Sequence, residues 1–392
     1  MADSNYQAVG GYSAYASEKA AARSRRSKWI VIGSVIGLIG IIAIGVGVGI
    51  SVSHNKKSSS GSSSSRAGDP QQTDPNDPST FVKDSRLHKS FYGLAYTPEG
   101  SLMPDCGNTL EAVIKDIQIM SQLTTRVRLY GADCNQSALV LEAIKQTKTD
   151  IQVFLGNYPV PSDPTVYTRQ RDIIKQAIQT YGTDHIAGVT VGNEFMLNYL
   201  GANSATDPNG PVGAQGAAIL KADIQDTRDM LASLSLPKTI PVGTSDAGSF
   251  FNTEILSSVD YGLSNVHAWF ANVSAADASA WVSNFFQETN VAPAAALPNR
   301  PKMYIAETGW PTKSSDASNA NNGASDASVA GLQTFIDTFV CQANTNGTGY
   351  FFFEFFDEVW KEKQYGGVEG WWGLFNSDRT LKDVKIPDCP SP

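Results

Sequence analysis

Two glutamates occupy equivalent places in the sequence, each at the end of a short apolar run. Residues 303–312 read MYIAETGWPT, so that Glu307 follows an apolar run and precedes a Thr-Gly-Trp-Pro turn. Residues 186–195 read IAGVTVGNEF, where a β-branched run ends at Glu194. A single glutamate in such a place commonly caps a helix or pairs with an arginine. Two glutamates placed alike predict a shared site.

Two carboxylic acids that face one cleft are the usual equipment for cleaving a glycosidic bond. One protonates the leaving oxygen, and the other attacks or stabilises the sugar centre. Their surroundings must differ, because one acid has to stay protonated and the other ionised. Asn193 directly precedes Glu194. Its amide can meet a sugar hydroxyl, or it can cap the helix that follows.

The elements around these glutamates alternate between strands and helices. Alternation forces parallel pairing of the strands, and about eight such units make a closed TIM-type (β/α)8 barrel. A doubly wound open sheet is the alternative, but it usually begins with a glycine-rich GxGxxG turn, which residues 90–100 lack. Barrel enzymes place catalytic groups at the carboxyl ends of the strands. The predicted strands cover residues 90–96, 124–130, 151–157, 186–191, 240–245, 264–270, 303–307 and 349–356, with helices expected over 110–120, 139–145, 169–181 and 217–234.

The composition favours a neutral polymer as partner. Charged residues make up 17% of the chain, and the formal net charge is −8. An acidic protein is a poor match for nucleic acid, which we therefore exclude as a partner. The HExxH, GxSxG and P-loop motifs are absent from the sequence, and no cluster typical of a metal site is visible. We expect neither a metal nor a cofactor.

Four cysteines without CxxC spacing indicate disulfides rather than a zinc or redox motif. They are Cys106, Cys134, Cys341 and Cys389, and sequence alone allows three pairings. We favour Cys106 with Cys134 and Cys341 with Cys389, because each pair flanks neighbouring predicted elements.

The N-terminal part of the chain differs from the rest. Residues 1–28 are basic near their end. Residues 29–52 form a run without charged residues, and this run is longer than the ~20 residues needed to cross a bilayer. That run is too long, and its leading arm too extended, for a signal peptide. We predict a cytosolic tail (1–28), a transmembrane helix (29–52), a disordered Ser/Pro-rich linker (53–84) and the barrel (85–392).

The excess of basic residues before the span predicts a single-pass type II protein of the plasma membrane, with its barrel outside the cell. An extracellular barrel can carry disulfides and N-linked glycans. All four cysteines lie beyond the span, as do three sequons at Asn135, Asn272 and Asn346.

Several motifs resemble glycoside hydrolase family 17, the endo-1,3-β-glucanases and related glucanosyltransferases. They are GNE at the fourth strand, IAETGWPT at the seventh, and FFDEVWK and EGWWGLF near the end, so that the resemblance spans residues 90–375. It implies a retaining enzyme for the β-1,3-glucan of cell walls, with Glu194 as acid/base and Glu307 as nucleophile. An N-terminal anchor with a Ser-rich tether resembles fungal type II members.

The resemblance also implies further polar site residues. Glu358, Lys361 and Glu369 fall on polar positions of the family's eighth-strand segment. Lys361 would keep a neighbouring carboxylate ionised, although a surface ion pair is an alternative for it. The family often has Tyr-Pro where this chain has His267 and Ala268, so the resemblance does not carry a sugar contact over to His267, and a lone histidine on a strand is more often a structural residue.

Aromatic rings near strand ends are candidates for stacking on apolar sugar faces. They are Tyr96, Tyr130, Phe270 and Trp310, of which Trp310 is the main candidate because it follows the nucleophile closely.

Three activities are compatible with this sequence. Transfer of the cleaved glucan to water gives hydrolysis, our leading hypothesis, and transfer to a second glucan chain gives transglycosylation. A wall-binding anchor without catalysis would keep the barrel, but such proteins usually lose a carboxylate, and both glutamates are present here.

Overall fold

A computed structural model describes residues 68–391 of the chain. The predicted tail, the predicted transmembrane helix and the first part of the predicted linker lie outside the described residues. Within residues 68–391, every helix is too short or too polar to span a bilayer.

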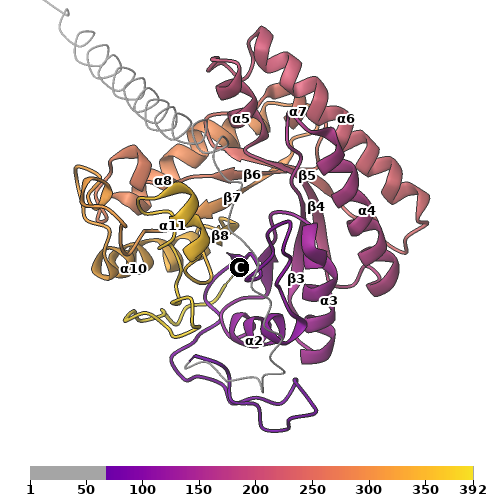
Figure 1. The fold of residues 1–392 in the computed structure, drawn as a ribbon. Helices are drawn as coiled ribbons and strands as arrows, with labels where there is room; N and C mark the ends of the chain where they lie inside the picture. Colours follow the sequence, from indigo (N-terminus) through magenta and orange to yellow (C-terminus); the bar gives the residue numbers. More distant parts are fainter. Residues whose placement is uncertain (1–67, 392) are drawn as a thin grey trace, which may run out of the picture.

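Eight parallel strands close into a barrel in sequence order, and β8 pairs with β1 (Figure 1). This confirms the predicted TIM-type architecture. The closed ring leaves no sheet edge, and all carboxyl ends of the strands lie at one rim. The strands are β1 (Gly93–Ala95), β2 (Arg126–Arg128), β3 (Gln152–Asn157), β4 (Ile186–Asn193), β5 (Val242–Ala247), β6 (Tyr261–Asn265), β7 (Lys302–Thr308) and β8 (Tyr350–Phe352).

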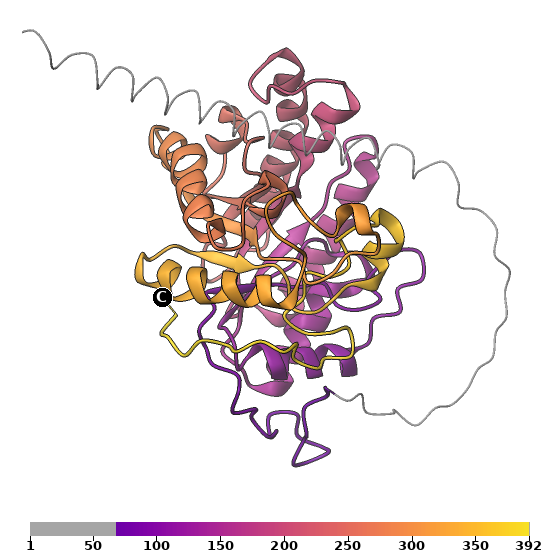
Figure 2. The same ribbon diagram turned by 90° about the vertical axis from the view of Figure 1, so that its left-hand side faces the viewer.

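Helices surround the strands on the outside, as the two views at right angles show (Figures 1 and 2). Side-chain caps start several of them: Thr109 accepts the amide of Ala112, and Asp163 precedes a proline at the first position of α4. The helices are α2 (Leu110–Met120), α3 (Gln136–Thr147), α4 (Pro164–Tyr181), α5 (Phe195–Ala202), α6 (Pro211–Ser233), α7 (Thr253–Leu256), α8 (Ala278–Phe286), α9 (Ala292–Ala295), α10 (Val329–Thr345) and α11 (Val359–Tyr365).

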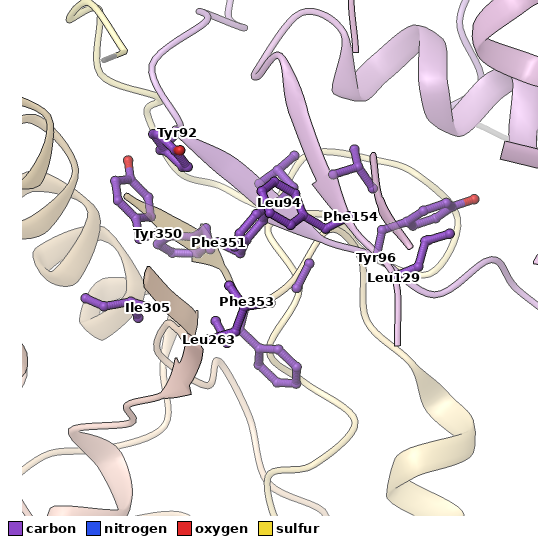
Figure 3. Packing of buried hydrophobic residues seen from close by; sticks show 14 of the residues in the cluster. Tyr92, Leu94, Tyr96, Leu129, Phe154, Leu263, Ile305, Tyr350, Phe351 and Phe353 are labelled. Carbon is purple, nitrogen blue, oxygen red and sulfur yellow. The ribbon is translucent and has the colours of Figure 1, made fainter. Parts of the chain in front are cut away.

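Aromatic rings fill part of the barrel interior. Phe154 lies 5.2 Å from Phe351 in edge-to-face contact, and both rings are labelled in Figure 3. Tyr261 lies 5.4 Å from Phe154, also in edge-to-face contact. Such pairs contribute about 0.5–1.5 kcal/mol beyond the area they bury. The interior is therefore a packed core, and the chemistry is confined to the rim.

The ends of β6 and β8 differ most from the predicted ones, since these strands end five and four residues earlier than expected. β6 stops at Asn265, because the chain turns into a short 3-10 helix at Trp269–Ala271. β8 stops at Phe352. Apolar residues that follow each strand extended the pattern in the sequence without extending the hydrogen-bonded ladder.

Both favoured disulfides are present, Cys106–Cys134 and Cys341–Cys389. The sequon asparagines Asn135, Asn272 and Asn346 are exposed and therefore accessible to glycosylation. Glycosylation at each remains a prediction.

Residues 68–89 form an N-terminal strap that packs against the barrel, the indigo segment at the lower edge of both views (Figures 1 and 2). Asp69 pairs with Lys115 of α2 at 2.9 Å, and Gln118 donates to the carbonyl of Pro78 at 2.7 Å. The predicted end of the disordered linker at residue 84 is therefore wrong for residues 68–84. Composition indicated disorder because the segment has few apolar residues, whereas an ion pair, a hydrogen bond and the packing of Leu87 against the core hold this strap.

Candidate active site

The two glutamates lie at the carboxyl ends of β4 and β7, on the same rim of the closed barrel. Glu307 is a residue of β7 and is 6% exposed. Glu194 directly follows β4 with a left-handed φ of 54° and precedes α5. A non-glycine residue in that region is sparsely populated and often marks a functional site.

Two cationic or hydrogen-bonding groups hold the carboxylate of Glu307. Nη1 of Arg128 donates to Oε1 at 3.0 Å, and Nε2 of His267 lies 3.0 Å from Oε2. Burial alone would raise the pKa of Glu307. The hydrogen bond from His267 and the charge of Arg128 outweigh burial and lower that pKa to about 2. Glu307 is therefore ionised at any pH near neutral.

Arg128 is almost fully buried and links four strands of the barrel. Besides Glu307 on β7, its Nη2 donates to Oδ1 of Asn193 at 2.7 Å and to Oγ of Ser245 at 2.9 Å. Asn193 ends β4 and Ser245 belongs to β5. The amide oxygen of Asn193 is thus committed to Arg128. Asn193 does not cap α5, whose cap position is occupied by Glu194.

Glu194 has a different environment from Glu307. Nδ2 of Asn265 donates a hydrogen bond to Oε1 of Glu194 at 3.0 Å. Burial and the negative charge of Glu307 raise the pKa of Glu194 to about 7, against the opposing effect of Asn265. Glu194 is therefore protonated below neutral pH, and the two acids of the rim carry opposite protonation states.

A buried carboxylate holds the turn that presents Glu194. The side chain of Asp246 accepts the amides of Met196 at 2.8 Å and Leu197 at 3.3 Å. These amides belong to the first turn of α5, where backbone donors lack partners within the helix. Asp246 thereby fixes the start of α5 directly after Glu194.

Lys361 lies inside a cluster of acids and is not a surface ion pair. Its Nζ lies 2.6 Å from Oε2 of Glu354 and 3.4 Å from Oε2 of Glu358. Trp360 donates to Glu358 at 2.7 Å. The charge of Lys361 offsets part of the burial that raises the pKa of Glu369. The three polar residues implied by the resemblance thus lie near one another.

The predicted aromatic residues separate into two groups. Tyr130 and Phe270 are half-buried; the ring of Tyr130 lies 4.2 Å from the guanidinium of Arg128, and Phe270 lies 5.9 Å from the ring of His267. These two remain candidates for contact with a ligand.

Trp310 and Tyr96 belong to the core, which corrects the prediction that they stack on sugar. Trp310 is fully buried, packs at 5.3 Å against Trp269 and donates to the carbonyl of Asp326. Tyr96 is 1% exposed and donates to Asp116 at 2.7 Å. Neither ring has a face available to a ligand, because each follows its strand on the side that packs against helices and loops.

Sequence reasoning missed Arg128, Asn265 and Glu354, and it discounted His267. The sequence did contain one indication of the role of Arg128, which is its place inside an apolar strand of the barrel. An arginine buried there needs an anionic partner. His267 was discounted as a structural residue, yet it contacts Glu307 directly. Within residues 68–391, no group of three or more histidine, cysteine or acidic side chains is arranged to hold a metal ion.

A closed β/α barrel with one protonated and one ionised glutamate on its catalytic rim defines the glycoside hydrolase class of barrels. Residues 93–373 match the family described as the BtgE/BtgC glycoside hydrolase domain. The chain belongs to this family.

Curated relatives carry related names. A putative glucan endo-1,3-beta-glucosidase btgC of Aspergillus niger is 34% identical over 331 residues, covering 81% of this chain and 46% of the relative. A probable glucan endo-1,3-beta-glucosidase btgC of Aspergillus fumigatus is 36% identical over 323 residues, covering 79% and 45%. The chain thus spans about half the length of the curated relatives it matches.

Solved structures share the fold. A glycoside hydrolase family 17 beta-1,3-glucanosyltransferase from Rhizomucor miehei superposes with a TM-score of 0.60 at 23% identity, covering 76% of this chain and 97% of that one. An endo-laminarinase from Formosa gives 0.59 at 17% identity, covering 74% and 84%. At these identities the likeness supports the barrel alone.

Proposed function

We propose that this protein is a retaining endo-1,3-β-glucanase that acts on the β-1,3-glucan of cell walls. The observation that carries the proposal is the contrast between its two glutamates. The pKa of Glu194 is raised to about 7, and that of Glu307 is lowered to about 2. Between these values one acid can give a proton while the other acts as an anion, which is the pair of states that cleavage of a glycosidic bond by two carboxyl groups requires. The retaining course, in which that anion attacks the sugar, is the part of the proposal that comes from the resemblance to glycoside hydrolase family 17.

The reaction follows from those two states. Protonated Glu194 donates its proton to the glycosidic oxygen as the bond from that oxygen to the anomeric carbon breaks, and a carboxylate oxygen of Glu307 bonds to the same carbon. Glu194, now ionised, takes a proton from the acceptor, whose oxygen displaces Glu307. Arg128 and His267 hold Glu307 in place and stabilise the anion that is released.

The names of relatives support the substrate class. The relatives from Aspergillus niger and Aspergillus fumigatus are both named as glucan endo-1,3-beta-glucosidases, and one solved neighbour from Rhizomucor miehei was crystallised with laminaritriose. A β-1,3-linked glucan is therefore the first substrate to test.

Transfer to a second glucan chain is the alternative outcome of the same intermediate. The solved neighbour with a TM-score of 0.60 is named as a glucanosyltransferase. Glu194 would activate a sugar hydroxyl in the same way as water, so the acceptor decides the product. A wall anchor without catalysis fits poorly, because both glutamates and their partners are in place.

We further propose that residues 29–52 anchor the protein in the plasma membrane with the barrel outside the cell. The charge pattern of the sequence supports this orientation. Two disulfides and three exposed sequons suit an extracellular domain. In intact cells, a protease added outside should cleave the barrel from the anchor, and removal of N-glycans should increase its gel mobility. A barrel protected in intact cells would refute the orientation.

The activity is tested with laminari-oligosaccharides and the full-length protein. We expect new reducing ends from internal cleavage, and any product longer than the donor would show transfer. Glu307→Ala should abolish turnover. Added azide should restore turnover by taking the place of the carboxylate, with an α-glycosyl azide as the product. Glu288→Ala serves as the control, because Glu288 is exposed on the outside of the barrel. Near-normal turnover by Glu307→Ala would exclude Glu307 as the nucleophile.

A further inference from the structure

α8 lies on the outside of the barrel (Figure 1), and a stacked pair of aromatic rings occupies one side of it. The ring centroids of Trp281 and Phe285 are 5.0 Å apart with 19° between the ring planes, and both side chains are half-buried. Residues four apart meet on one side of a helix, but such a pair stabilises the helix only slightly. Helix stability alone therefore explains poorly why two large rings stay in contact with water.

One ring of the pair rests on the catalytic rim of the barrel. A Cβ added to Gly248, which follows β5, would come within 2.5 Å of a ring carbon of Phe285. The amide of Gly248 donates to the carbonyl of Asn265 at 3.0 Å, and Nδ2 of Asn265 donates to Glu194. Nδ2 of Asn290 holds the carbonyl of Gly248 at 2.7 Å. Phe285 thus packs on the same backbone that positions the partner of Glu194.

The other ring, Trp281, lies farther toward the catalytic face. Helices of a β/α barrel run opposite to its strands, so the start of α8 lies nearest the carboxyl ends of the strands. Trp281 precedes Phe285 by about one helical turn, roughly 6 Å along the axis. Phe285 stacks on one face of the indole. The half-buried indole therefore stands at the outer edge of the catalytic face, supported from below.

The surroundings of the indole suit a neutral sugar polymer. Residues Ala278–Phe286 include no charged side chain, so this helix offers nothing to pair with an ionic partner. Asn284 is exposed and lies beside Trp281 on the helix surface, because the two are three residues apart. Its amide provides both a donor and an acceptor for sugar hydroxyls. An aromatic ring with an amide beside it matches a pyranose, which has an apolar face and a polar edge.

We propose that Trp281, supported by Phe285 and flanked by Asn284, is a second binding site for β-1,3-glucan outside the catalytic pair. This inference rests on the proposed function, because it takes its ligand from the proposed substrate. The site is continuous with the catalytic rim through Gly248 and Asn265. A long chain held at both places stays near the two glutamates between cleavages, because its second contact is made at a high effective concentration. A short oligosaccharide cannot reach both places and gains nothing.

The test measures binding to particles of insoluble β-1,3-glucan separately from turnover. For binding, the full-length protein carries Glu307→Ala, so that the glucan is not consumed. We expect Trp281→Ala to weaken this binding about twofold to tenfold, which is what one aromatic contact contributes, and Trp281→Phe to keep most of it. With Glu307 intact, Trp281→Ala should reduce turnover of the particles by a similar factor and leave kcat/KM for short laminari-oligosaccharides unchanged.

Tyr181→Ala is the matched control. Tyr181 is also a half-buried ring on an outer helix, but it ends α4, at the amino end of the barrel. Equal binding of Trp281→Ala and Tyr181→Ala to the particles would overturn the second site. A change in the oligomeric state of Trp281→Ala by light scattering, with unchanged binding to glucan, would assign the rings to contact between copies of the chain and would overturn it too.

The outcomes separate this inference from the proposed function. Normal turnover of short oligosaccharides with binding that does not depend on Trp281 would overturn the second site alone. Absence of turnover by the wild type would refute the proposed function, whereas binding to glucan that depends on Trp281 would still support the site. If Trp281→Ala does not fold, as judged by its near-UV circular dichroism, Asn284→Ala decides, because Asn284 is exposed. Weaker binding by Asn284→Ala supports the site, and unchanged binding overturns it.

Discussion

Replacement of Arg128 by glutamine tests the electrostatic account of the site directly. The guanidinium is 1% exposed, lies 3.0 Å from the carboxylate of Glu307 and also holds Asn193. Glutamine keeps a hydrogen-bond donor but removes the positive charge. The buried anion of Glu307 then loses its cationic partner at Oε1 and keeps the hydrogen bond with His267, so its pKa rises toward the value that burial favours.

The size of the effect follows from the pKa of Glu307. A pKa lowered from the usual 4.5 to about 2 by His267 and Arg128 together stabilises the folded state by roughly 3 kcal/mol, an order-of-magnitude upper value for the part that Arg128 supplies. Because the folded pKa lies below the unfolded one, this contribution is complete above pH 4.5 and disappears as pH falls toward 2. Loss of one partner of a buried ion pair typically costs about 3–5 kcal/mol, which agrees.

Urea denaturation at pH 7 and pH 3.5 measures this contribution. We expect Arg128→Gln to lose about 3 kcal/mol of unfolding free energy at pH 7 and less at pH 3.5, and the acid limb of its activity to move to higher pH. Arg126→Gln is the matched control, because Arg126 lies two residues earlier on β2 and stacks on the ring of Tyr92. The reasoning fails if both variants lose the same stability at both pH values and neither shifts the acid limb.

Three further predictions concern stability. The pKa of Glu194 in the folded protein is about 7, above its usual 4.5, so the ionisation of Glu194 destabilises the fold as pH rises between these values. In thermal melts, Glu194→Gln should be more stable than the wild type at pH 8 by about 1–2 kcal/mol, after allowance for partial exposure of Glu194. At pH 4 the two proteins should be equally stable. Replacing Cys341 and Cys389 by serine opens a loop of 48 residues and should cost about 4 kcal/mol in urea titrations. Trp310→Ala should lower the melting temperature, because loss of the buried ring costs about 3–5 kcal/mol of unfolding free energy. The KM for laminari-oligosaccharides should stay unchanged in the fraction that folds. A large rise in KM without a loss of stability would show that Trp310 contacts sugar.

The barrel was predictable because its signal is repeated along the chain. Each strand carries an apolar run with breakers around it, and alternation with helices permits few topologies. The ends of β6 and β8 were less predictable, because residues beyond each ladder are also apolar. The strap of residues 68–89 was missed for a related reason. Its attachment depends on single contacts, such as the ion pair of Asp69 with Lys115 and the packing of Leu87 on the core, which leave no periodic pattern.

The positions of the two glutamates were predictable, but their partners were not. Glu194 and Glu307 stand at the ends of recognisable strands, and the barrel places all strand ends on one rim. Arg128 is far from both in sequence, and its contact with Glu307 depends on which strands the closed barrel brings opposite each other. Trp310 shows the converse error, since it follows Glu307 closely in sequence but its ring is fully buried in the core.

The difference between the two acids arises from their partners and not from burial. Burial raises the pKa of both glutamates. Glu307 receives an arginine on one oxygen and a histidine on the other, whereas Glu194 receives one neutral amide from Asn265 and the repulsion of Glu307 itself. Holding Glu307 ionised therefore helps to keep Glu194 protonated. Any change that neutralises Glu307 should lower the pKa of Glu194 as well, so the two limbs of the pH profile cannot be tuned independently.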